Sequence, residues 1–409
     1  MMRAVVYDFS IPNYIAAKAL GKSFPSLYYG KPSAVALRNV HEPQLTGKRW
    51  VKMNPIYAGV CGSDMGAILF KTSPALTPFN SFPSVLGHEV VGVVTEIGTE
   101  VKEIEVGQRI AVDPYIACEV RGRTTLCQAC KEGLHSLCRY KSGTDVIGPG
   151  MILGFCNELP GGWSESLVVH ESMVIPVPQA ISDKVAVLFE PLSVGLHAVL
   201  RQPPEKGEHV LIIGGGMIAY TVIAALRLLE IDCHITHLSL LGYQQEMAMT
   251  LGVDKALTNR QELEEFMLTF PETTRHKPVI GKDVFVGGFD AVYDCIGSPE
   301  SLSDALRLSR GRGKITLVGC AGEIKKLDWT FVWANELSIV GTHAYSKKER
   351  WEGKELSTYE LLIELIKKHP DYPLEQLVTH EFPLDQYEEA IVANIERGKY
   401  KSIKTLLKI

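Results

Sequence analysis

The most constraining feature of the sequence is the segment HVLIIGGGMIAYTVIAALRLLE, in which an apolar run ends in glycines and then acquires helical spacing. A strand followed at once by a glycine-rich turn and a helix is typical of a parallel α/β unit. The later runs CHITHLS, FDAVYDCIG and KITLVGC supply further strands, with helical segments between them. This alternation predicts a doubly wound parallel sheet.

Residues 1–185 have a different texture, with short Val-, Gly- and Pro-rich runs such as VVGVVTEIG and RIAVDP. Such runs predict strands joined by tight turns, and hence a β-rich unit. With 409 residues, the chain is too long for one core of usual size. We expect residues 1–185 to form a first domain and 186–343 a second, with 344–409 returning to complete the first.

Composition and charge exclude several classes of protein. The net charge is −5 and no block of like charges stands out, so nothing suggests a nucleic-acid partner. The start MMRAVVYDF is typical of a strand and not of a signal peptide, and no apolar run is long enough to span a membrane. Nine cysteines without an export signal indicate a reducing, cytoplasmic compartment, where clustered cysteines more often bind metal than form disulfides.

One section of the first domain departs from the β-rich pattern. Residues 10–35 carry aromatics and prolines without a clear period, which predicts an inserted loop or short helix. The aromatic stretches 24–29 and 70–82, together with Trp163, are candidates for lining a substrate cleft. Aromatic residues in such loops nevertheless pack more often than they recognise a ligand.

Four of the nine cysteines lie within 21 residues of one another: Cys118, Cys127, Cys130 and Cys138. Four thiolates on one loop can surround a zinc ion and leave no open position, which is the structural type of site. Two alternatives stay open at this point. The clustering could be coincidence, or it could be a nucleic-acid-binding zinc finger, although no basic, aromatic-bearing helix lies nearby.

A second group of potential metal ligands is spread along the chain. Cys61 lies in GVCGSD, His88 and Glu89 are adjacent in GHE, and Glu190 begins EPLSV. Taken singly, each has an ordinary explanation: a buried cysteine is usually a small core residue, and a His–Glu pair is usually on the surface. Together, a thiolate, an imidazole and a carboxylate form a catalytic zinc set that leaves room for a substrate oxygen.

The glycine-rich turn has the form Gly214-x-Gly216-x-x-Ala219 between a strand and a helix, which matches the dinucleotide-binding fingerprint. Its backbone amides and the positive helix end would meet a pyrophosphate; a simple strand–helix turn is the alternative. At the position about 20 residues on, where NAD enzymes carry Asp or Glu, this chain has His237. No arginine follows for a 2′-phosphate, so we expect NAD, with NADP open. His237 could equally be a structural histidine facing solvent.

The order of these motifs carries a resemblance to a known family. GVCGSD, GHEVVGVVTEIG, the four-cysteine segment, EPLSVGLHA and the glycine-rich turn follow one another as in the zinc-dependent medium-chain dehydrogenase/reductases. The chain is most similar to the polyol and threonine dehydrogenase branch, over nearly its whole length. The resemblance implies a GroES-like β-barrel catalytic domain, a structural zinc lobe at about 115–140, a Rossmann domain, and a homodimer or homotetramer.

The resemblance also implies zinc ligands. Cys61 and His88 match the two ligands common to the family, Glu89 matches the carboxylate that binds zinc in the polyol branch, and Glu190 would bind directly or through water. The four clustered cysteines match the structural lobe. The chain departs from the family in having eight residues, EVRGRTTL, between the first and second of these cysteines, where two are usual.

The implied reaction transfers a hydride between a secondary alcohol and NAD(P). Ser63 matches the position that first accepts the alcohol proton, and Asp64 is expected to orient its neighbours. Gly66 stands where many relatives have a proton-relaying histidine. Either another group, such as Glu89 or a water chain, takes over that step, or the reaction is slow in the oxidative direction. The alternatives are a zinc-free enone or quinone reductase of the same superfamily and a non-catalytic nucleotide-binding protein. Small alcohols or ketones are the expected substrates, with neither nucleic acid nor membrane as a partner.

Overall fold

The computed structural model describes residues 1–30, 33–320 and 322–409, which form two compact units. The first unit contains Met1–Glu190 and Val378–Ile409, and the second contains Pro191–Leu377. The chain therefore returns to the first unit at residue 378, later than the expected boundary at 344.

The segment 344–377 stays with the second unit because its long helix packs there. α12 (Thr358–Lys368) begins at a capping box on Ser357 and buries an apolar face. At its other end, Lys368 donates to Glu230, a residue of the second unit, across 2.7 Å. These contacts correct the expected domain boundary. The alternation of helices and strands near the C-terminus did not show that α12 belongs to the second unit.

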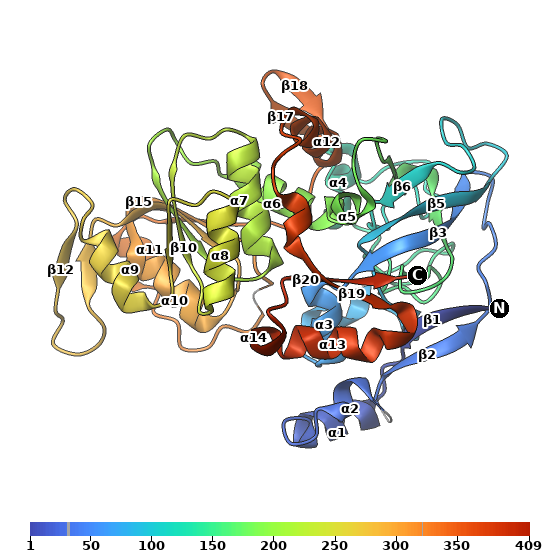
Figure 1. Ribbon diagram of the computed structural model, residues 1–409, viewed down its shortest axis with the longest axis horizontal. Coiled ribbons are helices and arrows are strands. Elements are labelled where there is room, and N and C mark those ends of the chain that lie inside the picture. The colour runs from blue at the N-terminus through green and yellow to red at the C-terminus, as the bar shows by residue number, and fades with distance from the viewer. Residues whose placement is uncertain (31–32, 321) are drawn as a thin grey trace. The chain divides into compact units, whose positions relative to one another are not determined.

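The first unit is β-rich, as its texture predicted (Figure 1). One sheet has the order β2-β1-β4, and a larger sheet has the order β19-β20-β3-β5-β6-β8 with β7 also paired to β3. Its strands are β1 (Met2–Tyr7), β2 (Val35–Val40), β3 (Trp50–Gly59), β4 (Ser84–Val85), β5 (Val90–Ile97), β6 (Arg109–Val112), β7 (Leu167–His170), β8 (Val174–Pro176), β19 (Val378–Pro383) and β20 (Lys404–Lys408).

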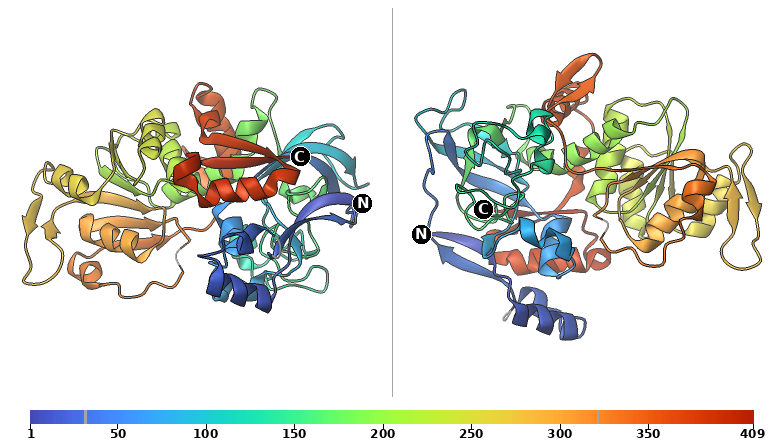
Figure 2. Two further views of the ribbon diagram at one scale, coloured as in Figure 1. Left: turned by 60° about the horizontal axis from the view of Figure 1, so that its bottom comes forward. Right: turned by 180° about the vertical axis from the view of Figure 1, so that it is seen from behind.

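Short helices connect these strands. They are α1 (Ile11–Leu20), α2 (Ser26–Tyr29), α3 (Gly62–Ile68), α4 (Gln128–Lys131), α5 (Asp183–Ala186), α13 (Tyr387–Ile395) and α14 (Arg397–Tyr400), with 3₁₀ turns η1 (Pro74–Phe79), η2 (His135–Leu137), η3 (Glu171–Met173) and η5 (Leu384–Gln386). The inserted segment 10–35 forms α1 and α2, which project beside the β1–β2 hairpin (Figure 2); residues 31–32 lie outside the described part. Ser10 caps α1 by accepting from the Asn13 amide.

The second unit is a six-stranded parallel sheet of order β11-β10-β9-β14-β15-β16, the doubly wound arrangement. Its strands are β9 (His209–Ile213), β10 (His234–Leu238), β11 (Lys255–Leu257), β14 (Phe289–Asp294), β15 (Ser309–Leu317) and β16 (Ser338–Gly341), with the hairpins β12 (Thr274–His276)–β13 (Val284–Val286) and β17 (Glu349–Trp351)–β18 (Lys354–Leu356). Its helices are α7 (Met217–Leu228), α8 (Gly242–Thr250), α9 (Arg260–Met267), α10 (Pro299–Leu308), α11 (Thr330–Ala334), α12 and η4 (Leu374–Leu377). α6 (Phe189–Arg201) starts at the end of the first unit. Every helix in the described ranges is too short or too polar to span a bilayer.

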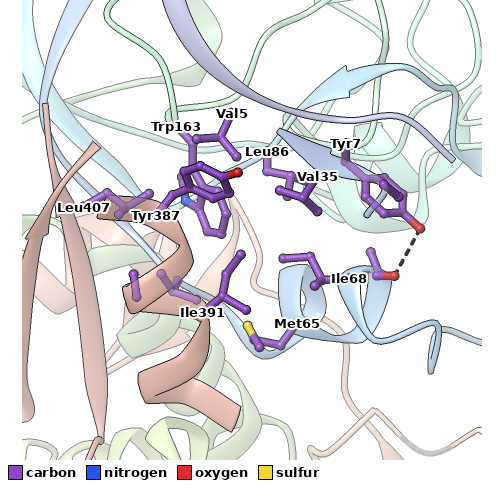
Figure 3. Close-up of a cluster of buried hydrophobic side chains, with 14 of the residues drawn as sticks. Val5, Tyr7, Val35, Met65, Ile68, Leu86, Trp163, Tyr387, Ile391 and Leu407 are labelled. Carbon is purple, nitrogen blue, oxygen red and sulfur yellow. Dashed lines mark hydrogen bonds between the residues drawn. The ribbon is translucent and has the colours of Figure 1, made fainter. Parts of the chain in front are cut away.

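Trp163 lies in the core of the first unit and not in a cleft (Figure 3). Its side chain is fully buried, and its indole N–H donates to the Gly59 carbonyl across 3.0 Å. The same cluster contains Tyr7, whose hydroxyl donates to the Ala67 carbonyl across 3.1 Å. A cleft-lining role for Trp163 is therefore wrong, because no face of the ring is open.

Replacing Trp163 with Phe is expected to lower the free energy of unfolding by about 2–3 kcal/mol. The smaller ring leaves a void, and the Gly59 carbonyl loses its donor. Urea unfolding followed by circular dichroism measures the change. A variant as stable as the wild type would show that this contact contributes little.

Candidate functional site

Strand pairing in the first unit gathers three of the predicted ligands. Cys61 is the N-cap of α3, directly after β3, while His88 and Glu89 directly precede β5. β3 and β5 are antiparallel neighbours, and the Gly59 amide donates to the Glu89 carbonyl across 2.8 Å. One ligand atom each from Cys61, His88 and Glu89 lie within 4.8 Å of one another.

Asp64 contacts two members of this group, Cys61 and His88. Its carboxylate accepts from the Cys61 amide across 3.0 Å, and its other oxygen lies 3.5 Å from His88 Nδ1. A carboxylate against Nδ1 leaves Nε2 of the ring as the atom that faces a metal. The Ser63 hydroxyl lies 3.3 Å from His88 Nε2. Burial lowers the pKa of His88, but the nearby Asp64 and Cys61 outweigh this effect, and the net pKa lies well above its ordinary value.

Lys404 is part of the same group, and sequence reasoning missed it. It lies in β20, which pairs with β3, and its side chain is only 2% exposed. Its ammonium forms an ion pair with Glu89 and donates to the Val60 carbonyl across 3.2 Å. Gly59 permits this close approach, because a Cβ at that position would collide with the Glu89 carboxylate. The signal was a lysine inside the apolar strand KTLLK, since a buried lysine needs a partner.

Glu190 lies nearby without joining the group of three. It is 9% exposed, in the first turn of α6. Burial raises its pKa to about 7; the charge of His88 opposes this rise, and that of Glu89 adds to it. Among the described residues, the group whose ligand atoms converge contains Cys61, His88 and Glu89.

The chemistry of these donors suits a divalent transition-metal ion. A thiol, an imidazole and a carboxylate are ligand types found in catalytic zinc sites, where one coordination position is left for water or substrate. His88 and Glu89 are each at most 3% exposed, whereas Cys61 is partly exposed, so a cation held by the three would be largely buried with one side nearer to solvent. The site could therefore hold zinc.

The four clustered cysteines also converge. Their sulfur atoms lie within 4.8 Å of one another, and all four side chains are buried. Cys127 caps α4, and the sulfurs of Cys118 and Cys138 are 3.7 Å apart. The longer spacing after Cys118 therefore does not keep it out of the cluster. A tetrahedral thiolate site is the geometry of a structural zinc.

Arg121 is a second residue that the sequence analysis missed. It lies in the eight-residue spacer of the lobe and is fully buried. Its guanidinium donates to carbonyls of residues Ile116, Ile147, Gly148 and Gly150. These acceptors are uncharged. Burial lowers the pKa of Arg121, and the charges of Cys156, of the lobe cysteines Cys138 and Cys118, and of Glu158 oppose this effect. A buried cation needs a compensating charge, and four thiolates around Zn²⁺ would supply one.

The glycine-rich turn of the second unit lies between β9 and α7, with Gly216 as the N-cap of α7 and Ala219 buried within it. His237, at the end of β10, is fully buried, and its Nε2 lies 2.6 Å from the Gly214 carbonyl. It does not face solvent. Burial lowers its pKa to about 4, although the hydrogen bond to Gly214 opposes this.

A β-rich unit with a thiol–imidazole–carboxylate group and a four-cysteine lobe, joined to a Rossmann unit, defines a zinc-binding alcohol dehydrogenase. Sequence models of known families agree with this class. Residues 47–179 match the alcohol dehydrogenase GroES-like domain, and residues 218–359 match the zinc-binding dehydrogenases.

Individual relatives also support assignment to the dehydrogenases. L-idonate 5-dehydrogenase of Vitis vinifera is 30% identical over 361 residues, covering 85% of each chain. L-threonine 3-dehydrogenase of Legionella pneumophila (strain Corby) is 26% identical over 343 residues, covering 83% of this chain and 88% of its own. The chain therefore belongs to the zinc-dependent medium-chain dehydrogenase/reductase family, and its relatives include polyol and threonine dehydrogenases.

A solved structure supports the fold independently. The short chain alcohol dehydrogenase of Escherichia coli CFT073, complexed with NADH, has a TM-score of 0.74 to this chain at 23% identity, covering 100% of this chain and 99% of its own. At this identity the likeness concerns the fold, which the sequence analysis predicted as GroES-like plus Rossmann.

The free energy of unfolding is expected to fall as the pH drops from about 6.5 to about 4, and His237 is expected to contribute about 3 kcal/mol of that fall. In this window the unfolded chain binds a proton on residue 237, while the folded chain keeps the ring neutral. Urea unfolding of the wild type and of a His237→Gln variant, at several pH values, measures the difference. Parallel pH profiles for the two proteins would contradict the assignment.

Proposed function

We propose that this protein is a zinc-dependent oxidoreductase that transfers a hydride between a secondary alcohol and NAD(P). The alcohol is of the polyol, sugar or hydroxy-amino-acid type, as the names of the relatives suggest. The observation that carries the proposal is the convergence of one thiol, one imidazole and one carboxylate within 4.8 Å in a chain of this family.

In this proposal Cys61, His88 and Glu89 hold the catalytic zinc, and Glu190 binds it directly or through water. The four lobe cysteines hold a structural zinc. When bound, the catalytic zinc supplies a Lewis acid that lowers the pKa of the substrate hydroxyl, and the nicotinamide accepts the hydride. Asp64 fixes the ligand geometry through its contacts to the Cys61 amide and the His88 ring.

Ser63 is proposed to take the alcohol proton first. Its hydroxyl lies beside His88 Nε2, on the side of the ring that faces the metal position. Glu89 is a poor carrier for the next step, because its carboxylate is engaged by Lys404. Gly66 offers no side chain, so a water chain is the proposed route to solvent.

The cofactor preference is proposed to be NAD. The segment SLLGYQQ after His237 contains no cation for a 2′-phosphate. A homodimer or homotetramer is proposed from the resemblance. A zinc-free enone reductase fits less well, because both thiol-containing groups are intact. A non-catalytic protein fits less well for the same reason.

Metal analysis combined with an absorbance assay at the NADH band tests the function. Two zinc ions per chain and alcohol-dependent reduction of NAD or NADP are expected, in a screen of polyols, sugars and hydroxy-amino acids. Enone reduction without zinc would support the reductase alternative. No turnover on the whole panel would support the non-catalytic one.

Replacing Ser63 with Ala is expected to lower kcat at least about 100-fold, because proton transfer loses its first acceptor. Cofactor binding should change little. Steady-state kinetics and NADH titration separate the two effects. The matched control is Ser23→Ala, at an exposed position between α1 and α2. Full turnover by the Ser63 variant would remove this residue from the mechanism.

Replacing Arg121 with Met is expected to speed loss of one of the two zinc ions about tenfold, because the thiolate cluster loses its buried counter-charge. Metal release into a chromogenic chelator measures the rate. Arg123→Met is the matched control, since Arg123 lies in the same spacer but is exposed. Equal release from both variants would contradict a charge-balancing role. Circular dichroism would show whether the Arg121 variant folds.

A further inference from the structure

The two peptide carbonyls of the glycine-rich turn are each held by a side chain. His237 Nε2, from β10, lies 2.6 Å from the Gly214 carbonyl oxygen. Gln244 Nε2, from α8, donates to the Gly215 carbonyl across 2.8 Å. A carbonyl only accepts, so His237 must carry a hydrogen on Nε2. Two separate elements therefore fix consecutive peptide planes.

Because a peptide is planar, fixing the Gly214 and Gly215 carbonyls also fixes the directions of the Gly215 and Gly216 N–H groups. In a planar trans peptide, the carbonyl and the following N–H point in opposite directions. A Gly214 carbonyl turned toward His237 directs the Gly215 N–H away from it. A Gly215 carbonyl turned toward Gln244 directs the Gly216 N–H away from that side chain. Both amides immediately precede α7, whose N-terminus carries the positive end of the helix dipole.

The two side chains are themselves well held. His237 is fully buried beside β9, with which β10 pairs. The Gln244 backbone carbonyl accepts from the Tyr220 hydroxyl across 3.1 Å, which ties the start of α8 to α7. The Gln244 amide also occupies the space beside Gly215, where any Cβ would collide with it. His237 and Gln244 thus restrain the turn through contacts from two separate elements.

We propose that His237 and Gln244 are positioning residues that preorganise the turn for a pyrophosphate group. They act through the Gly214 and Gly215 peptides and do not touch the ligand. This inference rests on the proposed function, since it concerns the dinucleotide of that reaction. In NAD enzymes the residue at this position is a carboxylate that binds the ribose. In this chain the residue is His237, and its proposed role is to hold the glycine-rich turn.

Calorimetric binding of ADP and of adenosine to the full-length protein tests the proposal. ADP carries the pyrophosphate and adenosine lacks it. His237→Leu and Gln244→Met, which cannot donate, are expected to bind ADP about tenfold more weakly. Adenosine binding should change less than about twofold. His237→Gln, which retains a donor, is expected to recover part of the ADP affinity. Glu246→Gln, at an exposed position of the same helix, is the control.

The outcomes separate this inference from the proposed function. Unchanged ADP binding in both donor-lacking variants would overturn the positioning role while leaving the dehydrogenase proposal intact. Equal weakening of ADP and adenosine would also overturn it, since that pattern indicates general damage. A wild type that binds neither ADP nor NADH would instead refute the proposed function. If His237→Leu fails to fold, the Gln244→Met comparison alone decides.

Discussion

The pairing of β3 with its neighbours is the constraint on which the candidate site depends. β3 ends at Gly59, two residues before Cys61, and β5 begins at Val90, directly after Glu89. Their antiparallel register brings distant parts of the sequence within coordination distance. β20 pairs with the same strand and brings Lys404 against Glu89. A shift of this register by one residue would turn the side chains of one strand to the opposite face relative to its partner.

The parts predicted from sequence are those carried by short, local patterns. The doubly wound sheet followed from apolar runs that alternate with helices, and the lobe followed from cysteine spacing. The candidate ligands Cys61, His88 and Glu89 were grouped from their ligand chemistry and from the order of their motifs, which resembles that of a family. The hairpins β12–β13 and β17–β18 were missed, because three-residue strands of largely exposed residues carry no apolar period.

What could not be predicted depends on contacts between distant residues. Lys404 is far from Glu89 in sequence, and the segment KSIKTLLKI does not indicate which residue pairs with the lysine. Arg121 looked like one basic residue in a polar spacer, yet it is fully buried. His237 was placed correctly at the end of its strand by counting. The direction of its ring depends on the Gly214 carbonyl, which no sequence pattern reveals.

The two buried cations suggest how metal binding and folding are linked. Each is held by backbone carbonyls and lies beside a candidate metal group that becomes anionic when its ligands deprotonate. Without metal, Lys404 still has its direct ion pair with Glu89, whereas the hydrogen bonds of the Arg121 guanidinium go to uncharged carbonyls. A buried cation without a counter-charge is costly, so the lobe gains more from its metal than the bonds to sulfur alone supply. Charge balance at the lobe therefore depends more on its metal than it does at the group around Cys61, where Lys404 and Glu89 pair directly.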